Sequence, residues 1–222
     1  TAYLIALIAG QFQAIHDQYE KIPLSFYTTP SLARYAENTF KSTKATMAFF
    51  EEEIGIPYAW DKYDQACVAD FVAGGMENTS LTILTDSTLY GTEFETLRSS
   101  DSLVAHELAH QWFGDLVTCK DWGHLWLNEG FATYYDALFQ EKYHGRDEFL
   151  YHMFHNAKSV VNVPNDSIPI VHRDFGDPMD QFSFRAYPKG AWVLHMLRSQ
   201  LGVDLYRRCI KTYLDRHKFG TV

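Results

Sequence analysis

The sequence is poor in cysteine, which limits the classes of protein it can belong to. Its three cysteines, Cys67, Cys119 and Cys209, are odd in number and far apart. That pattern suggests neither a disulfide framework nor a CxxC metal site, because both need paired or closely spaced thiols. It favours a reducing compartment such as the cytoplasm. One bridge plus one free thiol is the alternative, and a secreted or membrane-anchored full-length protein stays open.

Basic charge is also scarce. The 222 residues include 19 lysines and arginines against 28 acidic residues, a net charge of −9. This balance argues against general nucleic-acid binding, which needs a basic surface. The most apolar stretch, TAYLIALIAGQF at residues 1–12, lacks the ~20 apolar residues of a membrane-spanning helix. It also lacks the basic start of a signal peptide, so we expect neither a nucleic-acid partner nor a membrane segment.

Hydrophobic residues make up 46% of the chain and aromatics 16%, which is enough for a sizeable core. The hydrophobic pattern predicts strands in the first part of the chain and mainly helices after it, which indicates an α+β fold with segregated helices. The expected strands cover 3–8, 23–28, 64–72 and 79–84. The expected helices cover 31–54, 99–117, 125–143, 147–162 and a region from Tyr187 past Leu201, with an irregular stretch at 163–186.

The segment HELAH, residues 106–110, carries the clearest chemical signal. Positions i and i+4 share one face of a helix, so His106 and His110 can direct both imidazoles to one point. A catalytic zinc takes three protein ligands and leaves one position open. Glu107, beside the first histidine, has the place of the general base in this motif. The alternative for Glu107 is a solvent-facing glutamate, which fits poorly on a helix this apolar.

A third ligand is expected from the segment LWLNEGFA. Glu129 follows His110 after a gap of 18 residues, which suits a helix, a turn and a returning helix. Two histidines and one glutamate form a catalytic zinc set. The alternative is an ordinary carboxylate on the helix face, although its apolar neighbours make an unpaired charge costly. Asp136, two turns further along the same face, is a candidate acceptor for the second N–H of a ligating histidine, or else a surface aspartate.

Taken together, HELAHQWFGDLVT and NEGFA resemble the zinc aminopeptidases of the aminopeptidase N family, within the gluzincin group. The segment GGMEN, residues 74–78, resembles the exopeptidase signature of that family. The resemblance implies a substrate-binding role for Gly74, Gly75, Met76, Glu77 and Asn78, with Glu77 binding the free α-amine. Glycine lets a substrate backbone approach and pair like an added strand. The alternative is a Gly-Gly turn between two strands.

A second resemblance lies downstream, in AYPKGAWVLHML. It is similar to the family segment that carries a catalytic tyrosine, and it implies that Tyr187 donates a hydrogen bond to the developing oxyanion. The alternative is a tyrosine that only packs near a helix start. Pro188 stands where the family often has glutamate, and proline suits the first turn of a helix.

The resemblance implies a thermolysin-like catalytic domain at residues 13–222, with a small mixed β-sheet lobe and a mainly helical lobe. Residues 1–12 resemble the end of an N-terminal β-domain that is otherwise missing, and the family's C-terminal helical domain is missing too. The implied function is a zinc aminopeptidase with one zinc ion, acting on peptides with a free N-terminus.

Three alternatives stay open at this point. A bifunctional aminopeptidase and epoxide hydrolase shares the zinc motif and GGMEN, and turnover of a lipid epoxide would identify it. An endopeptidase would cleave N-blocked peptides. A non-catalytic scaffold would lack bound zinc, although such relatives tend to lose the ligands or the base that are present here.

Overall fold

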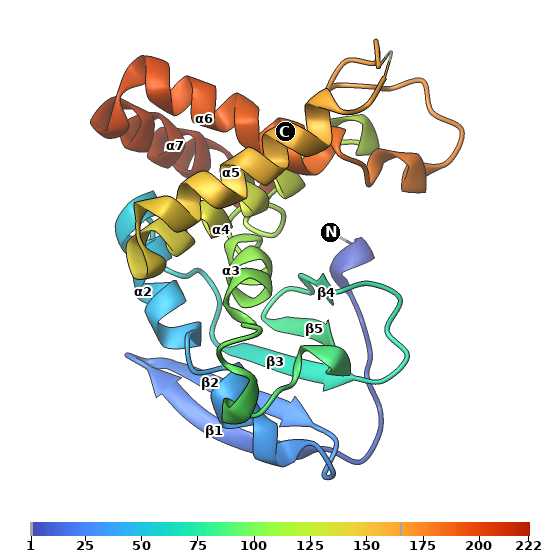
Figure 1. Cartoon of the computed structure of the whole chain (residues 1–222), viewed down its shortest axis with the longest axis vertical. Coiled ribbons are helices and arrows are strands. Elements are labelled where there is room, and N and C mark those ends of the chain that lie inside the picture. Colours follow the sequence, from blue (N-terminus) through green and yellow to red (C-terminus); the bar gives the residue numbers. More distant parts are fainter. Residues whose placement is uncertain (1, 165) are drawn as a thin grey trace.

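The computed structural model describes residues 2–164 and 166–222, and it divides into a sheet built early in the chain and helices built later (Figure 1). The predicted α+β class is confirmed. One five-stranded sheet has the order β1-β2-β3-β5-β4, and β2, β3 and β5 run parallel while β1 and β4 are antiparallel edge strands. Its strands are β1 (Gln13–Tyr19), β2 (Ile22–Thr28), β3 (Tyr63–Val68), β4 (Gly75–Met76) and β5 (Leu81–Thr85); a separate parallel pair joins β6 (Val117–Thr118) to β7 (Gly220–Thr221).

The helices follow the predicted ranges closely in the second half of the chain. They are α1 (Ala36–Thr39), α2 (Thr43–Ile54), α3 (Asp101–Ala109), α4 (Trp126–His144), α5 (Arg146–Val161), α6 (Gly190–Leu201) and α7 (Val203–His217). Short 3-10 turns are η1 (Ala2–Leu4), η2 (Ala33–Tyr35), η3 (Asp86–Thr88), η4 (Thr92–Phe94), η5 (Trp122–His124) and η6 (Pro178–Gln181), and η7 (Arg185–Lys189) is a π-helical turn. The predicted break at Gly202, which has a φ of 76°, is confirmed.

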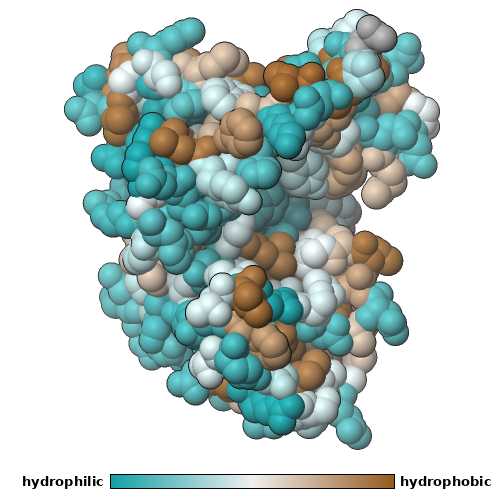
Figure 2. All heavy atoms as spheres, viewed as in Figure 1, coloured by the Kyte–Doolittle hydropathy of each residue, from teal (hydrophilic) through white to brown (hydrophobic). Residues whose placement is uncertain are grey.

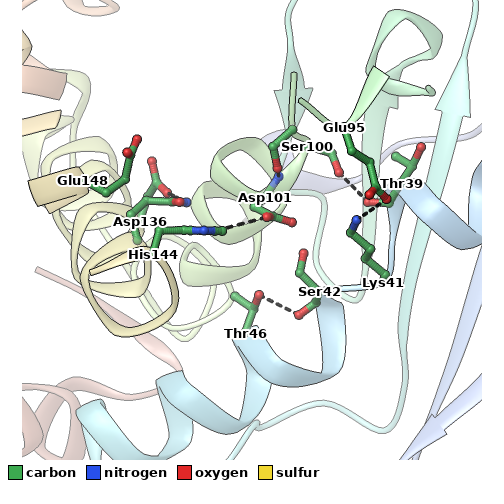
Figure 3. A network of polar contacts seen from close by, with 12 residues as sticks. Thr39, Lys41, Ser42, Thr46, Glu95, Ser100, Asp101, Asp136, His144 and Glu148 are labelled. Carbon is green, nitrogen blue, oxygen red and sulfur yellow. Dashed lines mark hydrogen bonds and ion pairs between the residues drawn. The ribbon is translucent and has the colours of Figure 1, made fainter. Parts of the chain in front are cut away.

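Helices α3 and α4 pack against each other as an antiparallel pair at the centre of the molecule (Figure 1). An ion pair at one end fixes their alignment, since His144 Nε2 lies 3.3 Å from Asp101 Oδ2 (Figure 3). Around them, Phe50 packs edge-to-face against Trp112 and Tyr135, with ring centroids 6.0 and 6.1 Å apart. These three side chains are fully buried, so the pair is anchored in the core.

The predicted strand at residues 3–8 is wrong. The chain forms η1 at Ala2–Leu4 and then runs without regular structure to β1. Ile5 and Leu7 are 83% and 92% exposed, so the apolar pattern is not used to fill the core of the described residues. A strand needs a neighbouring strand to satisfy its backbone hydrogen bonds. Within residues 2–164 and 166–222, the segment pairs with none.

Two predicted helices are shorter than the sequence pattern indicated. The one at 31–54 is interrupted between α1 and α2, where Phe40 turns inward and stacks on Phe26 with ring centroids 4.8 Å apart. The one at 99–117 ends after Ala109, because the chain reverses through Gly114 at a φ of 138°. Trp112 and Leu116 of the predicted apolar face are nevertheless buried.

The predicted irregular stretch at 163–186 contains only η6 and the start of η7 in its described part. Thr1 and Asn165, which fall within the predicted segments 1–12 and 163–186, lie outside the described residues. Across the described ranges, no helix combines the length and the apolar character that crossing a bilayer requires. Figure 2 shows that one side of the molecule is hollowed between the helical part and the sheet.

Candidate metal centre

Three side chains from α3 and α4 meet at one point. The Nε2 atoms of His106 and His110 lie 3.2 Å apart, and each lies 3.2 Å from Glu129 Oε2. His106 stands on the last turn of α3, His110 at its C-terminal cap, and Glu129 on the first turn of α4. The antiparallel pair therefore brings the three predicted ligands together, with His110 and Glu129 buried.

The spacing of these atoms suits a small metal ion better than hydrogen bonds alone. A tetrahedral ion bound at ~2.0–2.1 Å places its ligand atoms ~3.3 Å apart, which is close to the observed triangle. Each hydrogen bond needs its own proton between the two atoms. The protons on the two imidazoles therefore cannot form hydrogen bonds for all three atom pairs of the triangle. Two imidazoles and one carboxylate are also a donor set that zinc favours.

His110 is oriented by the backbone that follows α3. Its Nδ1 lies 2.9 Å from the carbonyl oxygen of Phe113. When the ring is neutral, Nδ1 donates its proton to that carbonyl and leaves the Nε2 lone pair facing His106 and Glu129. The chain reversal after α3 thus fixes the ring nitrogen that is available for metal binding.

The charges around the triangle are mainly negative. Glu77, Glu107 and Asp115 are buried near His110. Burial alone would lower the pKa of His110, but the carboxylates of Glu77, Glu129 and Glu107 together raise it well above its ordinary value. Burial opposes ionisation of Glu129, yet the imidazoles of His110 and His106 outweigh burial and lower its pKa. A bound cation would stabilise the charged forms of these buried carboxylates.

Glu107 lies next to the triangle but outside it. Its carboxylate is buried, and its Oε2 atom has no hydrogen-bond partner among the described residues. Burial raises the pKa of the Glu107 carboxyl well above its usual range. Glu107 also lies close to Glu77 and His110, and the side-chain oxygen and nitrogen atoms of these three residues lie within 4.8 Å of one another. The unpartnered oxygen is free to accept a proton from a molecule that enters the site.

The GGMEN segment forms the sheet edge nearest to α3. Gly75 and Met76 make up β4, which pairs with β5 on one side only. A Cβ on Gly75 would overlap the carboxylate of Glu107 and lie 2.7 Å from its Cγ, so a side chain at residue 75 would force Glu107 to move. Gly74 is less confined, since its Cβ would lie 3.5 Å from Leu103 Cδ1. The edge can therefore pair with an extended peptide directly beside Glu107.

Glu77 and Asn78 are fixed by contacts that the sequence does not indicate. Gln111 Nε2 donates to the Glu77 carbonyl at 3.2 Å, and Asn78 Nδ2 donates to the Leu4 carbonyl at 2.9 Å. The Tyr3 hydroxyl lies 3.4 Å from Glu77 Oε1. These partners come from segments far away in the chain, and no local motif marks them.

Tyr187 reaches the metal centre from η7. Its ring lies nearly parallel to the His106 ring, with centroids 6.0 Å apart and an interplanar angle of 11°. Burial and the nearby Glu129 carboxylate raise the pKa of Tyr187, so its phenol stays protonated and can donate. Pro188, which has no backbone N–H, sits inside the π-helical turn, and Lys189 N bonds instead to the carbonyl five residues back at 2.9 Å.

A glycine pair determines how closely η7 approaches. A Cβ on Gly130, which follows Glu129, would lie 2.8 Å from the Cα of Gly190 at the start of α6. The reverse substitution meets Gly130 at the same distance. This close backbone approach brings the turn that carries Tyr187 against the ligand-bearing end of α4.

Asp136 is buried on α4, and it accepts hydrogen bonds from residues other than the candidate ligands. Its Oδ2 accepts from Ser102 Oγ at 2.6 Å and its Oδ1 accepts from Gln140 Nε2 at 2.9 Å. Among the described residues, neither oxygen bonds to His106. Ser102 lies one turn before His106 on α3, so Asp136 contacts the same helix one turn away from the ligand. Asp136 thus reinforces the α3–α4 contact (Figure 3).

Comparison with known proteins places these features in context. The sequence model of the family described as "Peptidase family M1 domain" matches residues 38–222. The observed sheet and helices agree with the predicted thermolysin-like fold. The chain is similar to aminopeptidase N of Streptomyces lividans, with 34% identity over 99% of the chain and 27% of the relative. It is also similar to aminopeptidase 2 of Candida albicans, with 34% identity over 99% of the chain and 25% of the relative. Mouse endoplasmic reticulum aminopeptidase 1 shows 33% identity over 99% of the chain and 24% of the relative. The chain spans about a quarter of the length of these curated relatives.

Proposed function

The chain belongs to peptidase family M1, and from that premise we propose that it is the catalytic part of a zinc-dependent aminopeptidase. The reaction is hydrolysis of the first peptide bond of a substrate with a free N-terminus. The observation that carries the proposal is the triangle of His106 Nε2, His110 Nε2 and Glu129 Oε2, with sides of 3.2 Å. Beside it lie an unpartnered carboxylate and an open sheet edge.

In this proposal His106, His110 and Glu129 hold one zinc ion. When bound, zinc supplies Lewis-acid chemistry, which polarises a carbonyl group and makes water more acidic. Glu107 is the general base that takes a proton from the attacking water through its free Oε2. The same group then donates that proton to the leaving amine. Burial raises the pKa of Glu107, which favours its uptake of the proton from water.

Three further sets of residues act on the substrate. Glu77, which is buried directly after the edge strand β4, binds the cationic α-amine, and this limits cleavage to the first peptide bond. Gly74, Gly75, Met76 and Asn78 form the segment along which the peptide backbone lies. Tyr187, held beside His106, donates a hydrogen bond to the oxygen that becomes negative as the carbonyl is attacked.

The proposal is tested with one short peptide in two forms, with a free amine and with an N-acetyl group. Mass spectrometry follows the products of the full-length, zinc-loaded protein, and Glu107→Gln is the control. We expect stepwise loss of single residues from the free form only, and a fall in rate of about 10²–10⁴-fold in the control. Internal cleavage of both forms would instead identify an endopeptidase. No cleavage of either form, with zinc bound, would favour a non-catalytic scaffold.

A further inference from the structure

The N-terminal turn η1 lies beside the GGMEN segment, in a position that the proposed mechanism does not use (Figure 1). The Tyr3 hydroxyl is 3.4 Å from Glu77 Oε1. The next residue, Leu4, accepts a hydrogen bond from Asn78 Nδ2 at 2.9 Å. Two successive residues of the turn thus contact two successive residues of the segment.

Tyr3 is held from a second direction by the helix that carries a candidate ligand. Asn128 Nδ2 lies 3.0 Å from the Tyr3 hydroxyl, and Asn128 directly precedes Glu129. The Tyr3 ring packs edge-on against Trp122, with centroids 5.2 Å apart. The hydroxyl therefore bridges the sheet edge and the first turn of α4.

The directions of these hydrogen bonds follow from the groups involved. Asn128 Oδ1 accepts from the Cys119 backbone N–H at 3.1 Å, which leaves Nδ2 facing Tyr3. An amide nitrogen can only donate, so the Tyr3 oxygen accepts from it and its single proton is directed to Glu77. The chain of donors runs from Asn128 through Tyr3 to the Glu77 carboxylate.

We propose that Tyr3 is a positioning residue for amine recognition, whose hydroxyl orients the Glu77 carboxylate toward the α-amine of the substrate. This inference rests on the proposed function. The present separation of 3.4 Å is long for an O–H···O bond, and such bonds shorten when a ligand completes the site. Because Tyr3 acts through Glu77, its effect is confined to ligands that carry an amine.

The test compares two inhibitors that differ only in the amine: leucine hydroxamate and 4-methylpentanohydroxamate. Their inhibition constants and their effects on the melting temperature are measured for the full-length, zinc-loaded protein. The variant is Tyr3→Phe, which keeps the ring on Trp122. The matched control is Tyr19→Phe, which removes a tyrosine-to-glutamate hydrogen bond of 2.8 Å to Glu51, outside the site.

We expect Tyr3→Phe to raise the inhibition constant of leucine hydroxamate about tenfold relative to that of its amine-free analogue. KM for free-amine peptides should rise by a similar factor with little change in kcat, and Tyr19→Phe should leave the inhibitor ratio unchanged. Both inhibition constants are measured on the same sample, so a smaller folded fraction of the variant does not change their ratio. An unchanged ratio in Tyr3→Phe, or equal weakening of both inhibitors, would overturn the role of Tyr3. If the wild-type protein does not distinguish the two inhibitors, the proposed amine site itself fails.

Discussion

Gly75 and the side chain of Glu107 occupy adjoining space, so closely that a methyl group on Gly75 would overlap the Glu107 carboxylate. The glycine lies on the edge strand β4 and the glutamate on α3. The absence of a side chain at residue 75 therefore allows the candidate base to stand between the sheet edge and the metal centre. A motif that reads as a flexible turn serves here as a close contact.

Gly75→Ala is expected to displace Glu107 while leaving the three metal ligands in place. We predict a fall in kcat of about 10²-fold, the lower range for loss of a general base. Zinc content, measured by mass spectrometry of the metal, should stay near that of the wild type. Gly176→Ala serves as the comparison, since its added methyl would have no neighbour within 4 Å. An equal loss in both variants would contradict the specific contact with Glu107.

His110→Ala is expected to abolish stable zinc binding. The variant removes one corner of the triangle and leaves Glu129 with a single imidazole partner. We predict roughly one zinc per chain in the wild type and close to none in the variant after dialysis. His16→Ala, on β1 and bonded to Ser25, is the control that should retain its zinc. Full zinc content in His110→Ala would contradict the proposed ligand set.

Tyr187→Phe is expected to lower kcat with little change in KM. The phenol is proposed to donate to an oxygen that gains charge only during the reaction, so its loss affects the transition state alone. A fall of about 10²–10³-fold is typical for one such donor. Tyr143→Phe, which loses only an exposed bond to the Ala45 carbonyl, should keep its rate. A rise in KM with kcat unchanged would assign Tyr187 to substrate binding instead.

Gly130→Ala should lower stability as well as activity. The new methyl group would lie 2.8 Å from the Gly190 Cα, so α4 and α6 must move apart. Such overpacking costs about 1–3 kcal/mol in the free energy of unfolding, which urea denaturation measures. Gly176→Ala has no neighbour within 4 Å and is the control. Unaltered stability of Gly130→Ala would show that the two helices adjust without strain.

Part of the site could be predicted because helical periodicity converts spacing into position. The spacing of His106 and His110, followed by Glu129 on a returning helix, was enough to predict that their side chains meet. Asp136 shows the limit of this reasoning. Helical periodicity places it correctly on α4 but does not determine which side chains it hydrogen-bonds. Tyr3 and Asn128, 125 positions apart, show why the remainder was missed: their contact depends on tertiary packing and leaves no local pattern.

The fold was predictable to a similar depth. Strong apolar periodicity at 125–143 predicted α4 almost to its ends. The apolar run at 3–8 matched a strand equally well, yet a strand exists only where a partner supplies hydrogen bonds. The break between α1 and α2 likewise depends on the inward turn of Phe40, which propensity alone does not reveal.

The antiparallel pair of α3 and α4 has a consequence for the order in which the site is assembled. His106 and Glu129 are only 23 positions apart, whereas Tyr187 joins them from a much later segment. Contacts between near neighbours in a chain close smaller loops and form at a lower entropic cost. During synthesis, which proceeds from the N-terminus, the hairpin that gathers the three ligands emerges before the turn that carries Tyr187. If the proposed function holds, the nascent protein can capture an ion before the proposed catalytic centre is complete.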